Sequence, residues 1–529
     1  MEIVRVRQQV SQFLTYKDNP VPRDLAVNMV LQFLRDHLVS EGKPWLADGM
    51  AVLLMPDGTL KNLTLDNQEI TDFIHAAGLP LNSSWKQQVG DTLRTGSLPK
   101  TKLHGISYYD GIRHCLYLNE WDGRFLRIDG TGTVTRHTNG EFDLLFLMGA
   151  APHKTDLAQI SAERALTWTE DDALIKHVLG VGVFSESTGL QRHHAMNVLI
   201  AWLLAVMMKG RVRVVPIPLL NGPSGSRKTS MAFAIGSVIT PEGAEFRVVS
   251  CPADTASAEN ILINSHGIVC LDEFQSGKSL ANLLKSTTTG GVIKRRILFT
   301  TGGERTYTPD AVPFLTLNDD IWVDEATQRR MLRIAMGQPS MATGGWRGDY
   351  FIERDWVEGR VREKAWHELV SRLAASMRLL TNAKAVGRED IPVEHRMSGF
   401  WTFVLAIAEQ EGSAVLTDLS ATMAAVDASQ VAASEIGDDL LELLTDVLTH
   451  QKDLQREWIP ARVLKGALDL WSGLRSQSLP QGLRTTIQSS FALHRRLCSS
   501  NAYRTRLGFQ ERERRHVREY WFEIQEAQS

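Results

Sequence analysis

Three short apolar runs, each followed by polar residues, dominate the middle of the chain. They cover residues 214–220, 268–271 and 312–317 and consist largely of Val, Leu and Ile. Continuous apolar runs of this length are typical of strands that are buried on both faces of a parallel sheet. A helical pattern follows the first run, from Ser230 to Ser237. This alternation of buried strands and helices predicts an α/β core.

The regions on either side of the core have other periodicities. Residues 102–146 have the pattern of short strands, with Asp-Gly turns at 110–111 and 122–123. Helical patterns cover 155–210, the stretch from Gly337 to about 450, 461–474 and 485–497. We therefore predict an α+β N-terminal module over 1–150, a helical lead-in over 151–210, an α/β core over 211–340, a helical region over 341–450 and a basic C-terminal module over 451–529.

The segment between the first run and its helix has the composition of a phosphate-binding loop. Small residues there let backbone N–H groups surround a polyphosphate at the positive end of the helix. Lys228 is predicted to reach the β- and γ-phosphates, and the Thr229 hydroxyl to bind Mg²⁺. Arg227 stands where the G-x-x-x-x-G-K-[ST] pattern has its second glycine, and a conformation that required glycine would strain arginine. The predicted nucleotide-binding residues are Gly222, Pro223, Ser224, Gly225, Ser226, Arg227, Lys228 and Thr229.

Polar residues after the other two runs supply further candidates for phosphoryl-transfer chemistry. Asp272 is predicted to hold Mg²⁺ and Glu273 to orient the attacking water. Asn318 is placed to hydrogen-bond the γ-phosphate or that water. Arg329 and Arg330 are candidates for stabilising charge on the γ-phosphate of a neighbouring subunit. An ordinary turn, for Asn318, and a solvated helix face, for the arginines, remain alternative interpretations.

Charge and cysteine usage narrow the class of protein. The chain has 529 residues and a net charge of −3, which argues against a surface that binds nucleic acid throughout. From His450 onward, however, the sequence has 14 Lys and Arg and only 8 Asp and Glu, so this end of the chain is basic. The four cysteines include no C-x-x-C pair, which excludes a recognisable zinc ribbon. The longest apolar run, 198–208, is too short to span a bilayer and is expected to pack beneath the sheet. With no signal-peptide pattern, we predict a cytoplasmic protein without a membrane partner.

The basic C-terminal end is a candidate nucleic-acid surface. Its last part, 504–524, mixes charge with aromatic residues in the manner of the wing of a winged helix. The residues predicted to contact phosphates are Arg512, Arg514, Arg515 and Arg518. The alternative is a helical lid whose arginines pair with the acids at 511, 513 and 519.

The order of the central motifs resembles that of superfamily 3 helicase ATPases, in particular the ATPase half of phage and mobile-element primase-helicases. The likeness covers roughly residues 190–340 and includes the Thr289-Gly290-Gly291 segment. It implies an AAA+-like P-loop NTPase that uses ATP and Mg²⁺ and forms a ring, expected to be hexameric. It also implies that Lys228 and Thr229 belong to the first nucleotide motif, Asp272 and Glu273 to the second, that Asn318 is the sensor, and that Arg329 or Arg330 is the arginine finger.

A predicted β-hairpin lies between the second and third runs. Residues 297–300 and 305–308 have strand patterns on either side of a Gly-Gly turn signal. Ring helicases of the resembled superfamily place such a hairpin in the central channel, where basic residues contact phosphates. The residues expected to do so are Lys294, Arg295, Arg296 and Arg305. An ordinary surface hairpin is the alternative.

Together these features predict a nucleic-acid-dependent ATPase of a phage or mobile element, a ring translocase or helicase that moves DNA through its pore. A primase or an effector protein is a possible further partner. The N-terminal module has no paired-acid strand motif, so a binding or collar role is expected for it. The alternative from another class is an ATP-switched oligomeric sensor or loader, such as an antiviral defence ATPase, that unwinds nothing. A purely structural ring component is a third interpretation, suggested only by Arg227.

Overall fold

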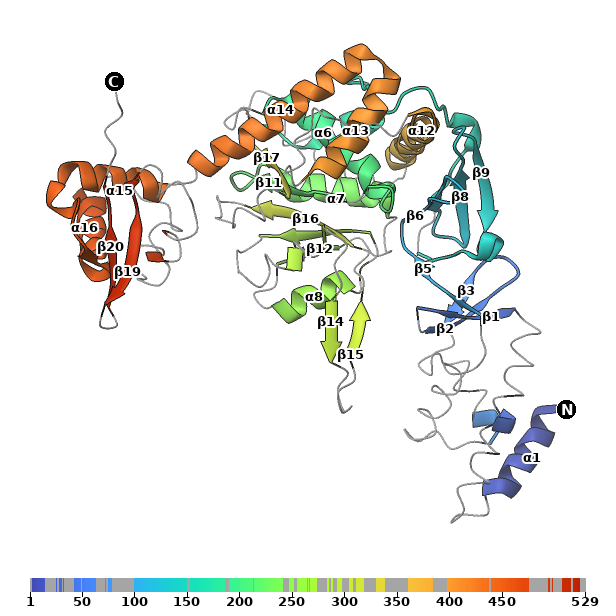
Figure 1. The fold of residues 1–529 in the computed structure, drawn as a ribbon. Helices are drawn as coiled ribbons and strands as arrows, with labels where there is room; N and C mark the ends of the chain where they lie inside the picture. Colours follow the sequence, from blue (N-terminus) through green and yellow to red (C-terminus); the bar gives the residue numbers. More distant parts are fainter. Residues whose placement is uncertain are drawn as a thin grey trace.

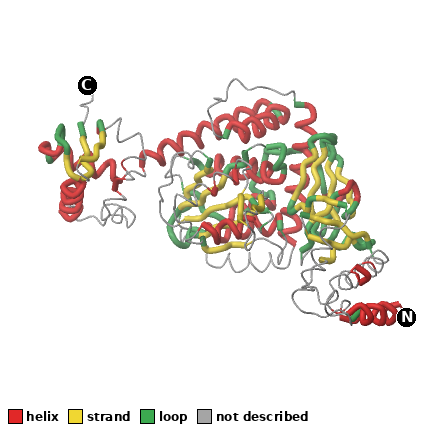
Figure 2. The backbone as a smooth tube through the Cα atoms, turned by 60° about the horizontal axis from the view of Figure 1, so that its bottom comes forward, coloured by secondary structure: helices red, strands yellow, loops and turns green. Residues whose placement is uncertain are grey.

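A computed structural model gives the fold of the chain. An N-terminal module leads into an α/β core and then, through a long helix, into a separate C-terminal module (Figures 1 and 2). The residues that the structure describes are 2–14, 25, 28–30, 32, 42–48, 50–62, 72, 75–78, 99–149, 153–185, 190–212, 214–240, 247–251, 255–263, 265, 267–273, 283–284, 287–288, 293–296, 304–307, 311–317, 330–337, 360–383, 397–436, 439–474, 493–494, 497, 507–514 and 517–523.

The core is built on a five-stranded sheet in which every strand is parallel to its neighbours. The order across the sheet is β12 (Arg247–Ser250), β13 (Ile268–Asp272), β16 (Val312–Leu317), β11 (Ile217–Asn221) and β17 (Met331–Ala335). Three of these strands fall on the three predicted apolar runs, so the predicted α/β class is confirmed. Because the strands are parallel, their carboxyl ends share one edge of the sheet and their amino ends share the other.

Helices cover both faces of this sheet (Figure 1). One face carries α6 (Arg192–Met207), α7 (Lys228–Ile239), α12 (Arg360–Asn382), α13 (Ser398–Glu411) and α14 (Ser413–Ile436), and the other carries α8 (Thr255–Ile263). The predicted apolar run at 198–208 lies in and just after α6 and is buried. Within it, Trp202 donates from Nε1 to the Pro216 carbonyl at 2.9 Å and packs edge-on against Phe314 of the sheet. The expected packing of this run beneath the sheet is therefore confirmed.

Short strands make up most of the described N-terminal module. After α1 (Glu2–Leu14), the first sheet contains β1 (Lys43–Ala47), β2 (Met50–Leu54), β3 (Leu60–Asn62) and β4 (Lys100–Thr101). An antiparallel meander follows, formed by β6 (Ser107–Asp110), β7 (Cys115–Asn119), β8 (Arg124–Ile128) and β9 (Val134–Thr138). β5 (Leu103–His104) pairs with β10 (Leu145–Phe146). β10 comes just after the 3₁₀ turn η1 (Glu141–Asp143) in the chain. The strands predicted around the two Asp-Gly turns are present as β6, β7 and β8.

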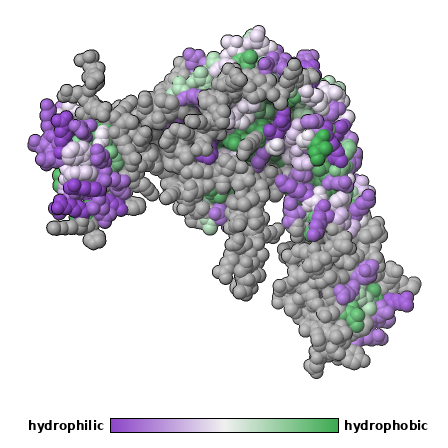
Figure 3. All heavy atoms as spheres, viewed as in Figure 1, coloured by the Kyte–Doolittle hydropathy of each residue, from purple (hydrophilic) through white to green (hydrophobic). Residues whose placement is uncertain are grey.

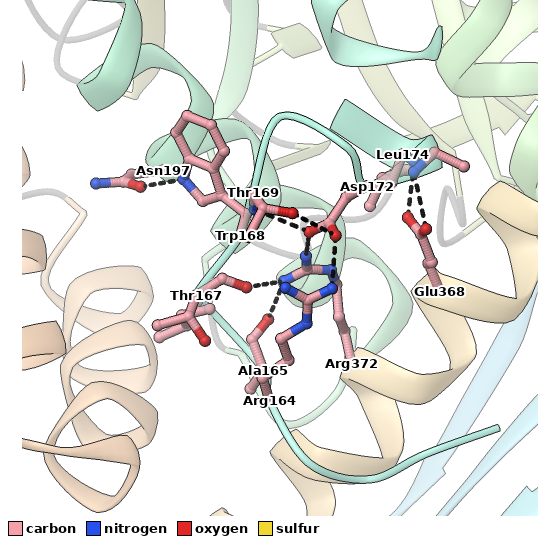
Figure 4. Close-up of polar contacts among 12 residues, drawn as sticks. Arg164, Ala165, Thr167, Trp168, Thr169, Asp172, Leu174, Asn197, Glu368 and Arg372 are labelled. Carbon is pink, nitrogen blue, oxygen red and sulfur yellow. Dashed lines mark hydrogen bonds and ion pairs between the residues drawn. The ribbon is translucent and has the colours of Figure 1, made fainter. Parts of the chain in front are cut away.

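The prediction that 155–210 is helical throughout is wrong for its first half. Between 155 and the start of α6, the helical elements of the described residues are two 3₁₀ turns, η2 (Leu157–Gln159) and η3 (Leu179–Val181), and the short α5 (Ala173–His177). Side chains take the place of helical hydrogen bonds here (Figure 4). Arg372 of α12 donates to the carbonyls of Ala165 and Thr167 at 3.0 and 2.7 Å, and Glu368 accepts from the N–H groups of Ala173 and Leu174, both at 2.8 Å.

A histidine joins the same lead-in segment to the core. His153 is buried and stacks on Trp366 of α12, with ring centroids 3.9 Å apart. Its Nε2 lies 3.2 Å from the Ile239 carbonyl at the end of α7. Burial lowers the pKa of His153 to about 3, although the hydrogen bond to Ile239 opposes the change. The imidazole is therefore neutral at physiological pH and donates to that carbonyl.

The C-terminal module has a hydrophobic core of its own. It contains α15 (Asp439–His450), the 3₁₀ turn η6 (Lys452–Leu454), β18 (Ile459–Pro460), α16 (Ala461–Leu474), β19 (Gln510–Arg514) and β20 (Val517–Trp521). The three strands form an antiparallel sheet in the order β18-β20-β19. Its visible surface is mainly hydrophilic (Figure 3). Among the described residues, no helix is both long and apolar enough to cross a membrane.

Candidate nucleotide-binding site

Residues 222–227 connect β11 to α7 at the carboxyl edge of the sheet. Gly222 can only be glycine here, because a Cβ atom would lie 2.1 Å from the Met336 carbonyl oxygen at the end of the neighbouring strand. The two strand ends are joined by a 2.6 Å hydrogen bond from the Met336 N–H to the Asn221 carbonyl. Gly225 has a φ of +83°, with open space around its Cβ position. Gly222 therefore fixes the start of the loop against the end of β17. Gly225 gives the loop a backbone conformation that favours glycine.

Arg227 takes the backbone conformation that the second glycine of the motif usually supplies. Its φ of 65° and ψ of 24° are left-handed, and it is the residue that directly precedes α7. A side chain in this conformation is disfavoured because its Cβ crowds the following carbonyl oxygen. The strain anticipated from the sequence is thus present in the backbone of this loop.

Lys228 is the first residue of α7 and is 6% exposed. Its Nζ donates to the Gly222 carbonyl at 2.7 Å, the Pro223 carbonyl at 2.9 Å and the Ser226 hydroxyl at 3.0 Å. These three oxygens hold the ammonium group inside the curve of the loop, beside the positive end of the helix dipole. A positive charge and a helix amino end together form the kind of site that phosphates bind.

The residue after Lys228 reaches across to the acid-bearing strand. The Thr229 hydroxyl donates to Asp272 Oδ1 at 3.1 Å, and Thr316 of β16 donates from its hydroxyl to the same oxygen. A hydroxyl and a carboxylate side by side suit Mg²⁺, which typically takes one or two protein oxygens and completes its shell with phosphates and water. Among the described residues, no group of three or more His, Cys, Asp and Glu could hold a metal, at this edge or elsewhere.

Glu273 follows Asp272 at the same edge and is exposed. Its φ of 53° marks a turn directly after β13. The structure thus brings together the loop, Lys228, Thr229 and both predicted acids. Thr316 was not predicted from the sequence. The available signal was that it is the only hydroxyl residue in the otherwise apolar third run.

Of the remaining catalytic candidates, Arg330 is the one that falls among the described residues, and it lies away from this edge. Asn318 and Arg329 lie outside the described residues. Arg330 directly precedes β17, and its carbonyl accepts from the Ile217 N–H at 2.9 Å, at the amino edge of the sheet. The five-residue strand between the two edges spans roughly 16 Å, at about 3.3 Å per residue. Arg330 is therefore on the opposite edge from the loop of its own chain.

The predicted hairpin exists, but its first strand begins earlier than expected. β14 (Ile293–Arg296) pairs antiparallel with β15 (Glu304–Tyr307), whereas 297–300 had been predicted as the first strand and lie outside the described residues. The basic residues Lys294, Arg295 and Arg296 therefore belong to the strand itself. The register places Arg295 opposite Arg305 and Arg296 opposite Glu304.

The C-terminal arginines differ in their surroundings. Arg512 lies over the Trp458 ring, 4.1 Å from its centroid, and donates from Nε to Glu519 at 2.7 Å. Arg514 and Arg518 are exposed on the two strands of the hairpin, and Arg515 lies outside the described residues. The side chain of Arg512 thus pairs with Glu519, as the alternative interpretation expected, but 510–514 and 517–521 form a β-hairpin, so the helical lid of that interpretation is wrong.

Comparisons with known proteins give structural neighbours but no family. No family model and no curated protein matches the chain. Similar solved structures include the apo C-terminal region of NrS-1, 11% identical over 93% of this chain and 98% of that chain, with a TM-score of 0.37. Another is the SCCmec type IV Cch active helicase, 13% identical over 90% of each chain, with a TM-score of 0.39. At such low TM-scores these likenesses carry no weight for function, which is argued from the contacts above.

Proposed function

We propose that the carboxyl edge of the sheet binds ATP with Mg²⁺ and hydrolyses it. The supporting observation is the contact of Thr229 with Asp272, because it joins the end of the phosphate loop to the acid-bearing strand 43 positions away in the sequence. In this proposal the loop N–H groups and Lys228 hold the β- and γ-phosphates. Bound Mg²⁺ would supply positive charge between those phosphates.

Asp272 and Glu273 have different roles in this proposal. Asp272 is fixed by two hydroxyl donors, from Thr229 and Thr316, which suits a metal ligand that must keep one orientation. Glu273 is exposed and lies one residue further on, so its carboxylate can accept a proton from a water molecule in front of the phosphates. General-base assistance of this kind is worth about 10²–10⁴ in rate.

The position of Arg330 supports a shared site between subunits. Arg330 lies at the amino edge, roughly 16 Å from the loop of its own chain. It can therefore act only on a γ-phosphate that is bound to the loop of a neighbouring subunit. We therefore propose a ring of subunits, as in the superfamily 3 helicases that the motif order resembles, with ATP bound between neighbours.

We further propose that hydrolysis moves nucleic acid, as in a helicase or translocase. The hairpin strands β14 and β15 contain four of the predicted phosphate contacts, Lys294, Arg295, Arg296 and Arg305, on a chain whose net charge is negative. In its described part, the C-terminal module combines the helices α15 and α16 with a three-stranded antiparallel sheet, an arrangement that fits a winged helix. Its exposed Arg514 and Arg518 lie on the β-hairpin that would form the wing.

Two substitutions test the nucleotide chemistry. Lys228→Ala should abolish ATP turnover by removing the phosphate cation. Glu273→Gln should bind ATP but hydrolyse it at least about 100-fold more slowly, because only water activation is lost. The matched controls are Lys176→Ala and Glu163→Gln, which change exposed residues outside the site and should retain wild-type rates. Equal ATPase rates in wild type and Glu273→Gln would refute the assignment. Strand separation by the wild type, measured on a forked DNA, then tests the helicase activity.

A further inference from the structure

A cavity of about 410 Å³ lies between the N-terminal β-strands and the amino edge of the central sheet. Its walls come from β5 and β6, from the end of α6 and the residues after it, and from the start of β16. The volume falls within the range of about 300–1,000 Å³ that is usual for small-molecule sites. The cavity exists only because the N-terminal module packs against the core.

This cavity is separate from the candidate ATP site. Val312, the first residue of β16, lines the cavity, whereas the carbonyl of Leu317 at the other end of β16 accepts from the Gly222 N–H at 3.2 Å. The strand between them spans roughly 17 Å, at about 3.3 Å per residue. A ligand in the cavity therefore cannot be the nucleotide held by the phosphate loop.

The lining combines positive charge with aromatic rings. Lys102 and Lys209 approach it from the N-terminal module and from the end of α6, and none of the described lining residues is acidic. His104 and Tyr108 lie with ring centroids 4.3 Å apart, and Tyr109 adds a phenol. The remaining wall is largely aliphatic. Such a lining suits a ligand that has an anionic group and a planar, partly apolar group.

We propose that this cavity binds a nucleoside phosphate, with the phosphate at the two lysines and the base against the aromatic rings. Base–aromatic stacking together with a basic groove is how single strands are held without sequence preference. The cavity also adjoins the hairpin in the chain, since β15 ends at Tyr307 and Ala311 lines the cavity. A single strand that follows the hairpin would thus reach it. Binding of a nucleotide that belongs to a single strand rests on the proposed function. Binding of a free nucleotide does not depend on it.

Photocrosslinking to protein without ATP tests the proposal directly. A (dT)₂₀ oligonucleotide that carries 5-iododeoxyuridine is irradiated with the full chain, and crosslinked tryptic peptides are identified by mass spectrometry. We expect a crosslink in the peptide of residues 103–113, which contains both Tyr108 and Tyr109. 5-Iododeoxyuridine monophosphate is the parallel probe for a free nucleotide. A crosslink with the oligonucleotide alone identifies a strand, and one with both probes identifies a free nucleotide as a further ligand. Absence of this peptide from both samples would overturn the proposal.

Binding isotherms of fluorescein-labelled (dT)₂₀ at several salt concentrations give a second measurement. Lys102→Gln and Lys209→Gln should each weaken binding several-fold and make the slope of log K against log salt shallower by about 0.7, the value for one phosphate contact on a single strand. Lys176→Gln on α5, which does not line the cavity, is the matched control and should bind like the wild type. Ser107→Tyr places a large side chain in the cavity without changing its charge and should remove the crosslink. Melting temperatures near the wild-type value show that the variants fold.

The outcome is independent of the ATPase assignment. Lys228→Ala should lose ATP turnover and keep the crosslink at residues 103–113, because the two sites lie at opposite edges of the sheet. If Lys228→Ala loses ATP turnover but the wild type gives no crosslink, the nucleotide site is supported and the cavity proposal is overturned. A crosslink in a protein that shows no ATPase activity would support the cavity and overturn the proposed enzyme function.

Discussion

Replacing Arg227 with glycine tests the backbone geometry of the phosphate loop. Arg227 has a φ of 65° and a ψ of 24° directly before α7. For a residue with a side chain, this conformation costs about 1–2 kcal/mol, which glycine avoids. Glycine also gives the unfolded chain more freedom, which offsets about 0.5–1 kcal/mol of that gain. Arg227→Gly should therefore raise the free energy of unfolding by roughly 0–1.5 kcal/mol.

The same substitution should leave the affinity for ATP unchanged or strengthen it by up to about tenfold, the equivalent of 1.4 kcal/mol. Relief of strain favours whichever loop conformation binds phosphates, because glycine can adopt all of them. Titration calorimetry with a non-hydrolysable ATP analogue and Mg²⁺ measures the dissociation constant. Arg456→Gly is the matched control, since Arg456 also has a positive φ, of 61°, but lies in the C-terminal module. It should not change the affinity for ATP.

Arg227→Asn separates conformation from charge, because asparagine tolerates the left-handed region and has no guanidinium group. We expect it to bind the analogue about as well as the wild type. A tenfold loss of affinity in both the Gly and the Asn variants would refute the strain argument. Arg227 would then be a side chain that contacts the nucleotide, and its place in the motif would reflect binding.

Three further predictions concern pH, assembly and attachment. Protonation of His153 is favoured in the unfolded chain, so the contribution of neutral His153 to the free energy of unfolding is complete above about pH 6.5 and is lost as the pH falls toward 3. At pH 5 this residue should lower the free energy of unfolding by about 2 kcal/mol, measured by urea unfolding. His153→Phe should not show this part of the pH dependence. If Arg330 acts in trans, mixing Arg330→Ala with Lys228→Ala should restore some ATPase activity, and a fully active monomer by light scattering would contradict the shared site. Neutralising Arg514 and Arg518 should weaken DNA binding and flatten its salt dependence while basal ATPase survives; unchanged isotherms at every salt concentration would contradict a nucleic-acid role for this hairpin.

The nucleotide edge was predictable because each of its parts is encoded locally. Lys228 and Thr229 follow one apolar run closely, and Asp272 ends another, so any parallel arrangement of these runs brings the three side chains to one edge. Thr316 was missed for the opposite reason. Its hydroxyl matters because β16 lies between β11 and β13, and the order of strands is a property of the whole sheet that no local pattern contains.

The errors have similar physical causes. Residues 155–172 have helical spacing of apolar positions, yet Arg372 from α12, some 200 positions later, binds the carbonyls of Ala165 and Thr167 and holds this part of the chain in an irregular path. In the hairpin, 293–296 and 297–300 both have strand-like composition, and the pairing of 293–296 with 304–307 belongs to the folded chain and cannot be read from composition alone. The cavity depends on contact between two modules, so its lysines and aromatic rings have no common signal in the sequence.

The strand β16 connects the two edges at which we place separate activities. At its carboxyl end Thr316 contacts Asp272, and just before its amino end Ala311 lines the cavity that follows the hairpin. Hydrogen bonds to β13 and β11 hold this strand on both sides, and an extended backbone cannot lengthen. A displacement of Thr316 that accompanies a change of ligands at Asp272 must therefore move β16 as a body or deform its neighbours. We expect nucleotide chemistry and nucleic-acid contact to respond to each other for this reason, although variants at either end affect only one directly. Stimulation of ATPase activity by single-stranded DNA is the measurement that reports this coupling, and a rate unaffected by bound DNA would contradict it.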